Sequence, residues 1–179
     1  SDSIAFSATR DPALSSGASA DIYTVRISER TATKLIQTRG PDTNPIWSPA
    51  GNLIAYQTAN GDDQGHFYRT GRIAITNRTS AVPVTITDLF DDSPRILGWS
   101  SQGVLFEASN GTAAHLYAAN DRVKQIRRIS DPPDLILQSA TFDRDFASTA
   151  FLCSYPNRPV EVCVSSLDKF GARPITSFS

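Results

Sequence analysis

The residues that could serve as a nucleophile and a general base are few, and their contexts do not favour catalysis. The two histidines are His66, in a stretch rich in Gly and Asp, and His115, in an apolar stretch expected to be a strand. No Gly-x-Ser-x-Gly sequence occurs, and the serines nearest to glycines, at 15–17 and 100–103, lack a strand-to-helix context. We therefore expect both histidines to be structural or surface groups, and we predict no catalytic residue in this chain.

Acidic residues occur in pairs, at 62–63, 91–92 and 143–145. The stretch 60–65 is rich in the oxygen ligands that Ca²⁺ prefers, but it lacks the EF-hand spacing and a closing Glu, so a solvated hairpin loop is the favoured interpretation. Asp91 and Asp145 fall just before or within expected turns, where Asp side chains accept hydrogen bonds from local backbone N–H groups. The sequence therefore predicts no metal site and no cofactor site.

Two cysteines, Cys153 and Cys163, lie on neighbouring expected strands that flank the stretch 155–159. Because they are ten residues apart across a hairpin, their side chains can face each other and form a disulfide. Two buried free thiols are the alternative, since the Cβ vectors of adjacent antiparallel strands often point apart. Both interpretations stay open at this point.

The composition is that of a globular protein without a strongly charged surface. Of the 179 residues, 40% are hydrophobic and 20% are charged, and the formal net charge is -1. The charged residues are scattered, so no basic stripe is available to a phosphate backbone or an anionic membrane. The longest apolar runs are a handful of residues, far below the roughly 20 that cross a bilayer. We therefore expect neither a nucleic acid nor a membrane as a partner.

The N-terminal residues give no direct evidence of export. The stretch 1–6 has neither the basic n-region nor the apolar h-region of a signal peptide. The sequence also contains no methionine, so we expect it to be a processed product or an excised piece of a longer protein. The compartment, cytoplasmic or periplasmic, therefore stays open.

One short pattern recurs along the chain at the spacing of a structural repeat. In its clearest copy, at 47–56, a Ser-Pro-Ala-Gly-Asn turn separates Trp47 from the apolar strand 53–56. A shorter copy spans 99–106, and a degenerate copy without Pro or Gly spans 142–151. The stretch 4–6 looks like the second strand of an earlier copy. The aromatic residues that close these strands are separated by 50, 50 and 45 residues: Phe6, Tyr56, Phe106 and Phe151.

Each of these aromatic residues is followed by a third and a fourth expected strand. The third strands are at 21–25, 72–76, 114–118 and 160–164, and the fourth are at 33–36, 84–87, 125–129 and 173–176. Sets of four short strands repeated about every 40 to 50 residues are typical of a β-propeller. We predict an all-β chain, a β-propeller fragment of about four blades, each a four-stranded antiparallel sheet, with the first blade incomplete. The expected blades are approximately 1–40, 41–89, 90–132 and 133–179.

A β-sandwich is the alternative fold. The second strands, such as 53–56 and 104–106, are apolar on both faces, as expected for a blade that packs between two neighbours. Matched sets of four strands also favour the propeller over the sandwich. Trp47 and Trp99 occupy the same repeat position, so we expect both in the core between blades, and we expect truncation of Trp47 to Ala to cost about 3 to 5 kcal/mol.

The order and spacing of the repeat pieces resemble a known family. The stretches 21–23, 40–49 and 51–56 are similar to the propeller of acylaminoacyl and dipeptidyl peptidases of the prolyl oligopeptidase family. Two later stretches agree with the family's last blades: 90–94 before Trp99, and 157–162 before 173–176. The sequence departs from the family pattern at Ala50, where an Asp is usual, and in the turn 142–146.

The resemblance implies a role without chemistry of its own. In that family the propeller caps a catalytic α/β-hydrolase domain and restricts its substrates to short or unfolded peptides, so the resemblance implies that domain and a peptide substrate as partners. A binding-only propeller that engages proteins, as in the Tol system, is the alternative, because its blades share the Trp-Ser-Pro-x-Gly turn. Four blades would leave apolar faces at both ends, so we also expect a homodimer through the open blades.

Overall fold

The computed structural model describes residues 2–10, 13, 19–59, 70–77, 82–88, 90, 92–120 and 125–178. The regular elements of this part are fifteen short strands, and the chain is all-β there, as its β-branched and aromatic content predicts. Strands that follow one another within a sheet pair antiparallel. In the described part no helix has the length and hydropathy needed to cross a bilayer.

The strands form four consecutive meanders. The first sheet holds β1 (Ser3–Ala8), β2 (Asp21–Arg26) and β3 (Ala32–Ile36). The second sheet holds β4 (Asp42–Trp47), β5 (Leu53–Thr58), β6 (Arg72–Asn77) and β7 (Val84–Thr85). The third meander holds β8 (Arg95–Ser100), β9 (Gly103–Asn110), β10 (Ala113–Ala119) and β11 (Ile126–Arg128). The fourth holds β12 (Ile136–Phe142), β13 (Ser148–Tyr155), β14 (Arg158–Ser166) and β15 (Arg173–Pro174).

The last two meanders are not wholly separate sheets. A single parallel residue pair, Ala114 with Ile136, joins β10 to β12, so hydrogen bonding is continuous from β8 to β15. The sequence alone gives no sign of this link, because the prediction is for four independent antiparallel sheets.

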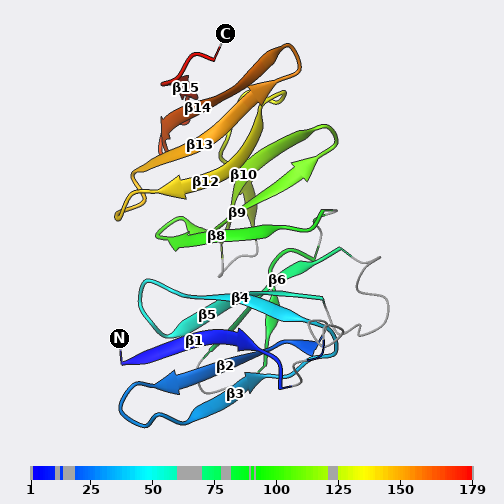
Figure 1. Cartoon of the computed structure of the whole chain (residues 1–179), viewed down its shortest axis with the longest axis vertical. Coiled ribbons are helices and arrows are strands. Elements are labelled where there is room, and N and C mark those ends of the chain that lie inside the picture. The colour runs from blue at the N-terminus through cyan, green and yellow to red at the C-terminus, as the bar shows by residue number, and fades with distance from the viewer. Residues whose placement is uncertain are drawn as a thin grey trace.

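The four meanders follow one another along the long axis of the molecule (Figure 1), with β1–β3 at one end and β12–β15 at the other. The first strand of the second sheet, β4, contacts β1 and β2 on one side and β8 on the other. This is the face-to-face stacking of propeller blades, and the row of sheets is open, not closed into a ring. The first sheet lacks a strand that corresponds to β4, β8 and β12 within the described residues.

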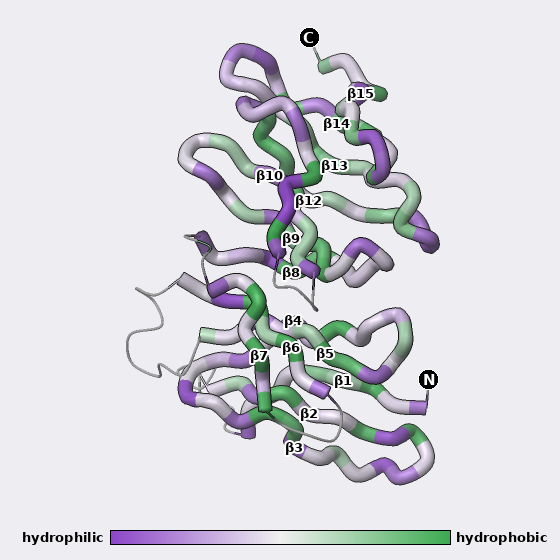
Figure 2. The backbone as a smooth tube through the Cα atoms, turned by 180° about the vertical axis from the view of Figure 1, so that it is seen from behind, coloured by the Kyte–Doolittle hydropathy of each residue, from purple (hydrophilic) through white to green (hydrophobic). Residues whose placement is uncertain are grey.

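Each interface between neighbouring meanders is filled by an apolar cluster. In each, a buried repeat aromatic from the later meander packs against residues of the earlier one: Tyr56 on Ile22 and Ile36, Phe106 on Ile73 and Ile86, and Phe151 on Leu116 and Ile129. The hydropathy-coloured tube shows hydrophobic stretches running along these inner-facing strands (Figure 2). The predicted aromatic repeat is therefore a packing repeat.

The first strand of the second, third and fourth meanders carries a β-bulge at the same repeat position. The register shifts by one residue between Thr43 and Ile46, between Ile96 and Gly98, and between Gln138 and Thr141. A bulge adds one residue to one strand and bends it. These bends recur where the first strand of each meander crosses its repeat aromatic.

The residue that follows the first strand's aromatic caps the next turn in all three copies. The Ser48 hydroxyl accepts from Leu53 N at 3.1 Å, and the Ser100 hydroxyl accepts from Gln102 N at 3.1 Å. In the degenerate third copy, Asp143 accepts from two backbone N–H groups, those of Ala147 at 2.7 Å and Ser148 at 3.1 Å. The turn function survives although the Pro and Gly are missing. The prediction assigned this role to Asp145, but Asp143 performs it.

The two tryptophans differ, contrary to the expectation that both lie in the core between blades. Trp99 is 7% exposed and belongs to the cluster between the second and third meanders. Trp47 is only half-buried and lies outside the clusters of buried residues. Trp99 packs with residues of the second sheet where β8 meets β4, whereas Trp47 joins no buried cluster although β4 contacts β1 and β2.

Candidate functional site

Of the candidate catalytic residues, His115 can be described and His66 lies outside the described residues. His115 is 1% exposed, with Nδ1 3.1 Å from Ser130 Oγ and Nε2 3.1 Å from the Pro133 carbonyl oxygen. Because the Pro133 carbonyl oxygen can only accept, Nε2 carries the proton and donates to it. Nδ1 then accepts from the Ser130 hydroxyl, whose oxygen in turn accepts from Leu116 N. Both ring nitrogens are thus occupied, and burial, with the nearby Arg128, lowers the pKa of His115. This position fits the structural role expected for His115.

The serines and acidic pairs form no catalytic or metal centre in the part of the chain that can be described. Ser100 lies in its turn, while the stretches 15–17 and 60–65 and Asp91 lie outside the described residues. Asp92 is anchored, since it accepts from the backbone N–H groups of Ser93 at 2.8 Å and Ser109 at 2.5 Å. Within the described ranges, no group of three or more His, Cys, Asp or Glu side chains is placed to hold a metal ion.

The two cysteines lie on one face of the β13–β14 hairpin. Cys153 pairs with Glu161 and Cys163 pairs with Phe151, so the cysteines are diagonal neighbours, with their Cα atoms 5.8 Å apart. Their sulfur atoms are bonded in the structure, and both residues are buried against the third meander. This geometry is within the range of natural disulfides. The oxidation state in solution stays a prediction.

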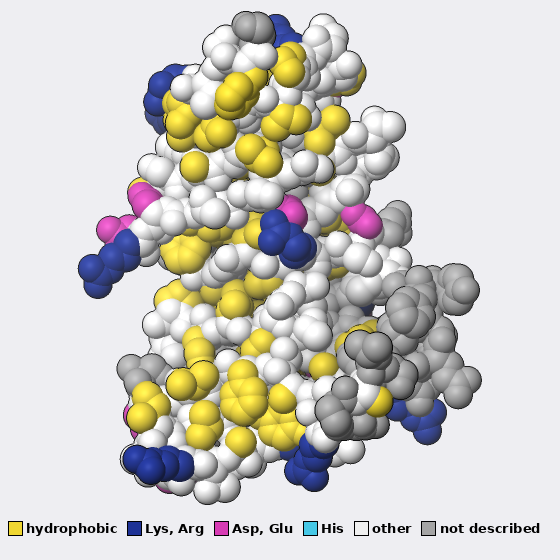
Figure 3. All heavy atoms as spheres, viewed as in Figure 1, with side chains coloured by type: hydrophobic (Ala, Val, Ile, Leu, Met, Phe, Trp, Pro, Cys, Tyr) yellow, Lys and Arg dark blue, Asp and Glu magenta, His cyan; other side chains and the backbone are white. Residues whose placement is uncertain are grey.

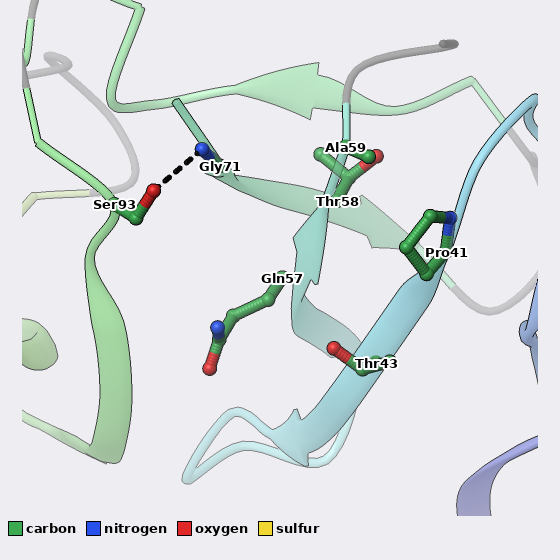
Figure 4. A pocket seen from close by; sticks show the side chains of 7 residues that line it. All are labelled: Pro41, Thr43, Gln57, Thr58, Ala59, Gly71 and Ser93. Carbon is green, nitrogen blue, oxygen red and sulfur yellow. Dashed lines mark hydrogen bonds between the residues drawn. The ribbon is translucent and has the colours of Figure 1, made fainter. Parts of the chain in front are cut away.

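A cleft opens at the edge of the sheets where β4 begins and β5 ends; we call it the rim cleft. It has a volume of about 220 Å³ and lies between the second sheet and the approach to β8 (Figure 4). Its walls are neutral, being formed by Pro41, Thr43, Gln57, Thr58, Ala59, Gly71 and Ser93. The cleft is therefore a small site of mixed apolar and uncharged polar groups, without a charged lining residue in the described part of the chain.

Hydrogen bonds fix the orientation of the Gln57 side chain in the rim cleft. Its Oε1 accepts from the Ile96 backbone N at 3.2 Å and from Asn44 Nδ2 at 2.8 Å. Because a backbone N–H can only donate, the atom facing Ile96 must be the oxygen, and the amide NH₂ points the other way. Gln57 thus links the second sheet to β8 and presents a donor. Ser93 lies across the cleft, where its hydroxyl accepts from Gly71 N at 2.9 Å.

The next meander repeats this site with charged groups. Thr43 pairs with Gln57 across β4 and β5, and Arg95 pairs with Glu107 at the same repeat position across β8 and β9. Arg95 Nε donates to Glu107 Oε1 at 2.6 Å, and a cleft of about 160 Å³ lies beside this pair. The two clefts have one backbone plan and different chemistry.

Sequence reasoning missed Asp42, which is 0% exposed at the start of β4. Its Oδ2 accepts from the Thr38 hydroxyl at 2.8 Å, and its backbone N donates to the Ala20 carbonyl at 2.7 Å, so Asp42 ties the first sheet to the second. Burial raises the pKa of Asp42, against the opposing hydrogen bonds from Thr58 and Thr38. Its Oδ1 and the Tyr56 hydroxyl are buried without a hydrogen-bond partner. No motif in the sequence marks this residue.

These features define a β-propeller segment: antiparallel meanders stacked face to face, with clefts at the edge and no catalytic group in evidence among the described residues. No protein-family profile matches the sequence, and no curated protein matches it. The comparison with solved structures, in contrast, finds many propellers.

Three of the similar structures cover both classes of protein considered above. TolB from Acinetobacter baumannii has a TM-score of 0.71 at 14% identity over 99% of this chain. An acylaminoacyl peptidase from Pyrococcus horikoshii has a TM-score of 0.69 at 19% identity, also over 99%. The β-propeller domain of the Trilobed protease from Pyrococcus furiosus has a TM-score of 0.71 at 14% identity, over 99%. At these identities the likeness establishes the propeller fold.

The chain is shorter than the proteins that it resembles. It spans 41% of the TolB chain, 26% of the acylaminoacyl peptidase and 53% of the Trilobed protease propeller domain. The whole proteins' activities are therefore properties of longer chains.

Proposed function

We propose that this chain is the non-catalytic propeller portion of a serine peptidase of the prolyl oligopeptidase family. In this role it gates the access of short peptides to a catalytic α/β-hydrolase domain outside this sequence. The observation that carries the proposal is the likeness of nearly the whole chain to the acylaminoacyl peptidase structure, together with the family-like stretches 21–23, 40–49 and 51–56. The blade division at 1–40, 41–89, 90–132 and 133–179 is part of the same proposal.

The gene beyond the codon for Ser179 tests this proposal. The expected result is an open reading frame for a domain of roughly 200 residues or more that contains a Gly-x-Ser-x-Gly elbow. A stop codon soon after Ser179 contradicts the peptidase proposal.

The isolated chain is expected to hydrolyse neither chromogenic aminoacyl nor acyl-aminoacyl substrates, because it has no nucleophile elbow and its one described histidine is buried. Turnover that follows the chain through purification and is lost on mutating one of its own serines contradicts this expectation.

The second candidate is a binding-only propeller that engages a protein partner. The observation that favours it is the likeness to TolB from Acinetobacter baumannii and to a putative TolB from Agrobacterium tumefaciens, the latter at 15% identity with a TM-score of 0.70. Pull-down from a bacterial envelope extract with the 179-residue chain as bait, compared with a Gly103→Val variant as an unfolded control, distinguishes specific capture from background.

We also propose that two copies of this chain associate through their end sheets. Hydrophobic side chains gather near both ends of the molecule (Figure 3). At one end Ile4 is 51% exposed, and at the other Leu152 is 37% and Val160 is 48% exposed. Exposed apolar patches of this kind mark association surfaces.

A further inference from the structure

We infer that the rim cleft is a binding site for an uncharged amide carbonyl group, such as that of a peptide main chain. The choice of a peptide as the source of this carbonyl rests on the proposed function. The evidence for the binding site itself comes from the residues of the rim cleft.

The first support is a set of hydrogen-bond donors that face one small volume. Ile96 N and Asn44 Nδ2 both donate to Oε1 of Gln57. The Nε2 of Gln57 has no acceptor in the described part of the chain and is free to donate to a ligand. Thr43 pairs directly with Gln57, and Figure 4 shows its hydroxyl turned toward that side chain. The Ser93 hydroxyl accepts from Gly71 N, which leaves its proton for another acceptor. These groups are complementary to an oxygen that accepts.

The second support is preorganisation. Gln57 is held by two hydrogen bonds from different meanders and Ser93 is held by one from Gly71, just before β6, so these donors lose little freedom when a ligand binds. Thr43 is β-branched and lies on a strand, which restricts its side chain further.

The third support concerns charge. Among the seven described residues that line the cleft, none is charged, so a carboxylate would find no cation to replace its hydration. A neutral carbonyl loses less on leaving water, and donors of the amide and hydroxyl kind match it. The ligand class is therefore an uncharged amide and not an anion.

The repeat-related cleft supplies an internal contrast. At the position of Gln57 it has Glu107, and at the position of Thr43 it has Arg95, and these two side chains bind each other. A carboxylate at this repeat position is thus compatible with the fold. Gln57→Glu should keep the acceptor for Ile96 and Asn44 and replace only the donor.

The test is a titration of the 179-residue chain with N-acetylglycine N-methylamide, followed by ¹H–¹⁵N NMR at Ile96 N, Gly71 N and the Gln57 side-chain NH₂. We expect saturable shifts at these groups with a dissociation constant on the order of millimolar, as befits a ligand of this size. Acetate at the same concentration is expected to give no saturable shift there.

Three variants make the test specific. Thr43→Val removes a hydroxyl that lines the cleft and is expected to weaken binding about five-fold, because the ligand loses one donor. Gln57→Glu is expected to weaken it about ten-fold or more, because an acceptor replaces the donor. Thr33→Val, an exposed substitution on β3 away from the cleft, is expected to leave binding unchanged.

Binding that is absent, equal in Thr43→Val and wild type, or as strong for acetate as for the diamide overturns the inference. If Gln57→Glu disturbs the contact with β8, the Ile96 N resonance reports it, and Thr43→Val then decides alone. Neither result depends on the gene beyond Ser179, so failure of this inference and failure of the proposed function are distinguishable.

Discussion

The ring of Phe146 lies directly against Gly98, so that a Cβ built on Gly98 would be 2.7 Å from Phe146 Cε1. Gly98 is in β8 and Phe146 is in the turn between β12 and β13, so this contact joins the third and fourth meanders. Phe146 has a φ of 55°, a region that bulky residues rarely adopt. Gly51, with a φ of 71°, occupies the same turn position in the second sheet. Packing on Gly98 compensates for the unusual backbone of Phe146.

Gly98→Ala is expected to lower the free energy of unfolding by about 1 to 3 kcal/mol, because the ring of Phe146 must move away from the new methyl group. Denaturant unfolding followed by intrinsic fluorescence measures the loss. In the double variant Gly98→Ala/Phe146→Ala, the loss is expected to be smaller than the sum of the two single losses, since the clash no longer exists. Additive losses contradict a direct contact.

Trp99→Ala is expected to cost about 3 to 5 kcal/mol, because Trp99 is buried between two meanders. Trp47→Ala is expected to cost clearly less, since Trp47 is half-buried and lies outside the buried clusters. Paired urea denaturation curves compare the two variants. Equal losses contradict the difference in packing between these repeat-equivalent residues.

Asp42→Asn is expected to leave stability at pH 7 unchanged or raised by up to about 1 kcal/mol. Burial raises the pKa of Asp42 in the folded state, so the folded state binds the proton more tightly than the unfolded state. Stability from this group is therefore fully present below its unfolded pKa and lost as pH rises through the folded pKa. Asparagine stays uncharged and keeps an acceptor for Thr38.

Thermal unfolding between pH 3 and pH 7 measures this effect, with the Asp42→Asn curve expected to be flatter than that of the wild type. Asp42→Ala is the matched control, and it is expected to cost about 1 to 3 kcal/mol because the Thr38 donors lose their acceptor. If Asp42→Asn lowers the free energy of unfolding as much as Asp42→Ala does, burial of the Asp42 charge does not destabilise the fold, which contradicts this prediction.

His115 is expected to make the chain less stable in mild acid. Burial lowers the pKa of His115 in the folded state, so its contribution to stability is present above the unfolded pKa of about 6.5 and is lost as pH falls below that value toward the folded pKa. Protonation would also put a second proton between Nδ1 and Ser130. His115→Gln keeps a donor and an acceptor, and its unfolding temperature is expected to fall less between pH 7 and pH 5 than that of the wild type.

Thiol titration of the denatured, unreduced protein is expected to find no reactive thiol, and two after reduction. The register of β13 and β14 places Cys153 and Cys163 as diagonal neighbours with Cα atoms 5.8 Å apart. A disulfide that closes a loop of this size adds about 2 to 3 kcal/mol to the free energy of unfolding. Two thiols before reduction would show that the pair is free, which was the alternative left open by the sequence.

The sequence predicts the fold well because the fold is repetitive. The spacing of Tyr56, Phe106 and Phe151 reports directly on the packing between meanders, since each fills the same place at its interface. The turn chemistry of Ser48-Pro49-Ala50-Gly51 is likewise local and can be read from residue types. Local signals and a fixed period therefore suffice for the strands.

The rim cleft and Asp42 could not be found in the same way. Gln57 acquires its role from a hydrogen bond to Ile96, 39 residues away, and Asp42 from the carbonyl group of Ala20, just before β2 of the first sheet. These contacts depend on how the meanders stack and leave no pattern in the sequence. Trp47 is a further example. Its repeat position predicts a buried side chain, but its actual burial depends on the side chains around it in the folded chain.

Static light scattering of the 179-residue chain at micromolar concentrations tests the central claim, that this is an open propeller segment with apolar end faces. Leu152 lies on the face of β13 opposite Phe151 and Cys153, which face the third meander. The account predicts a concentration-dependent dimer that Leu152→Lys weakens without lowering the unfolding temperature. It also predicts that Val82→Lys, a control at a 73% exposed site near β7, leaves the dimer unchanged. A folded chain that stays monomeric at every concentration contradicts the open-ended arrangement.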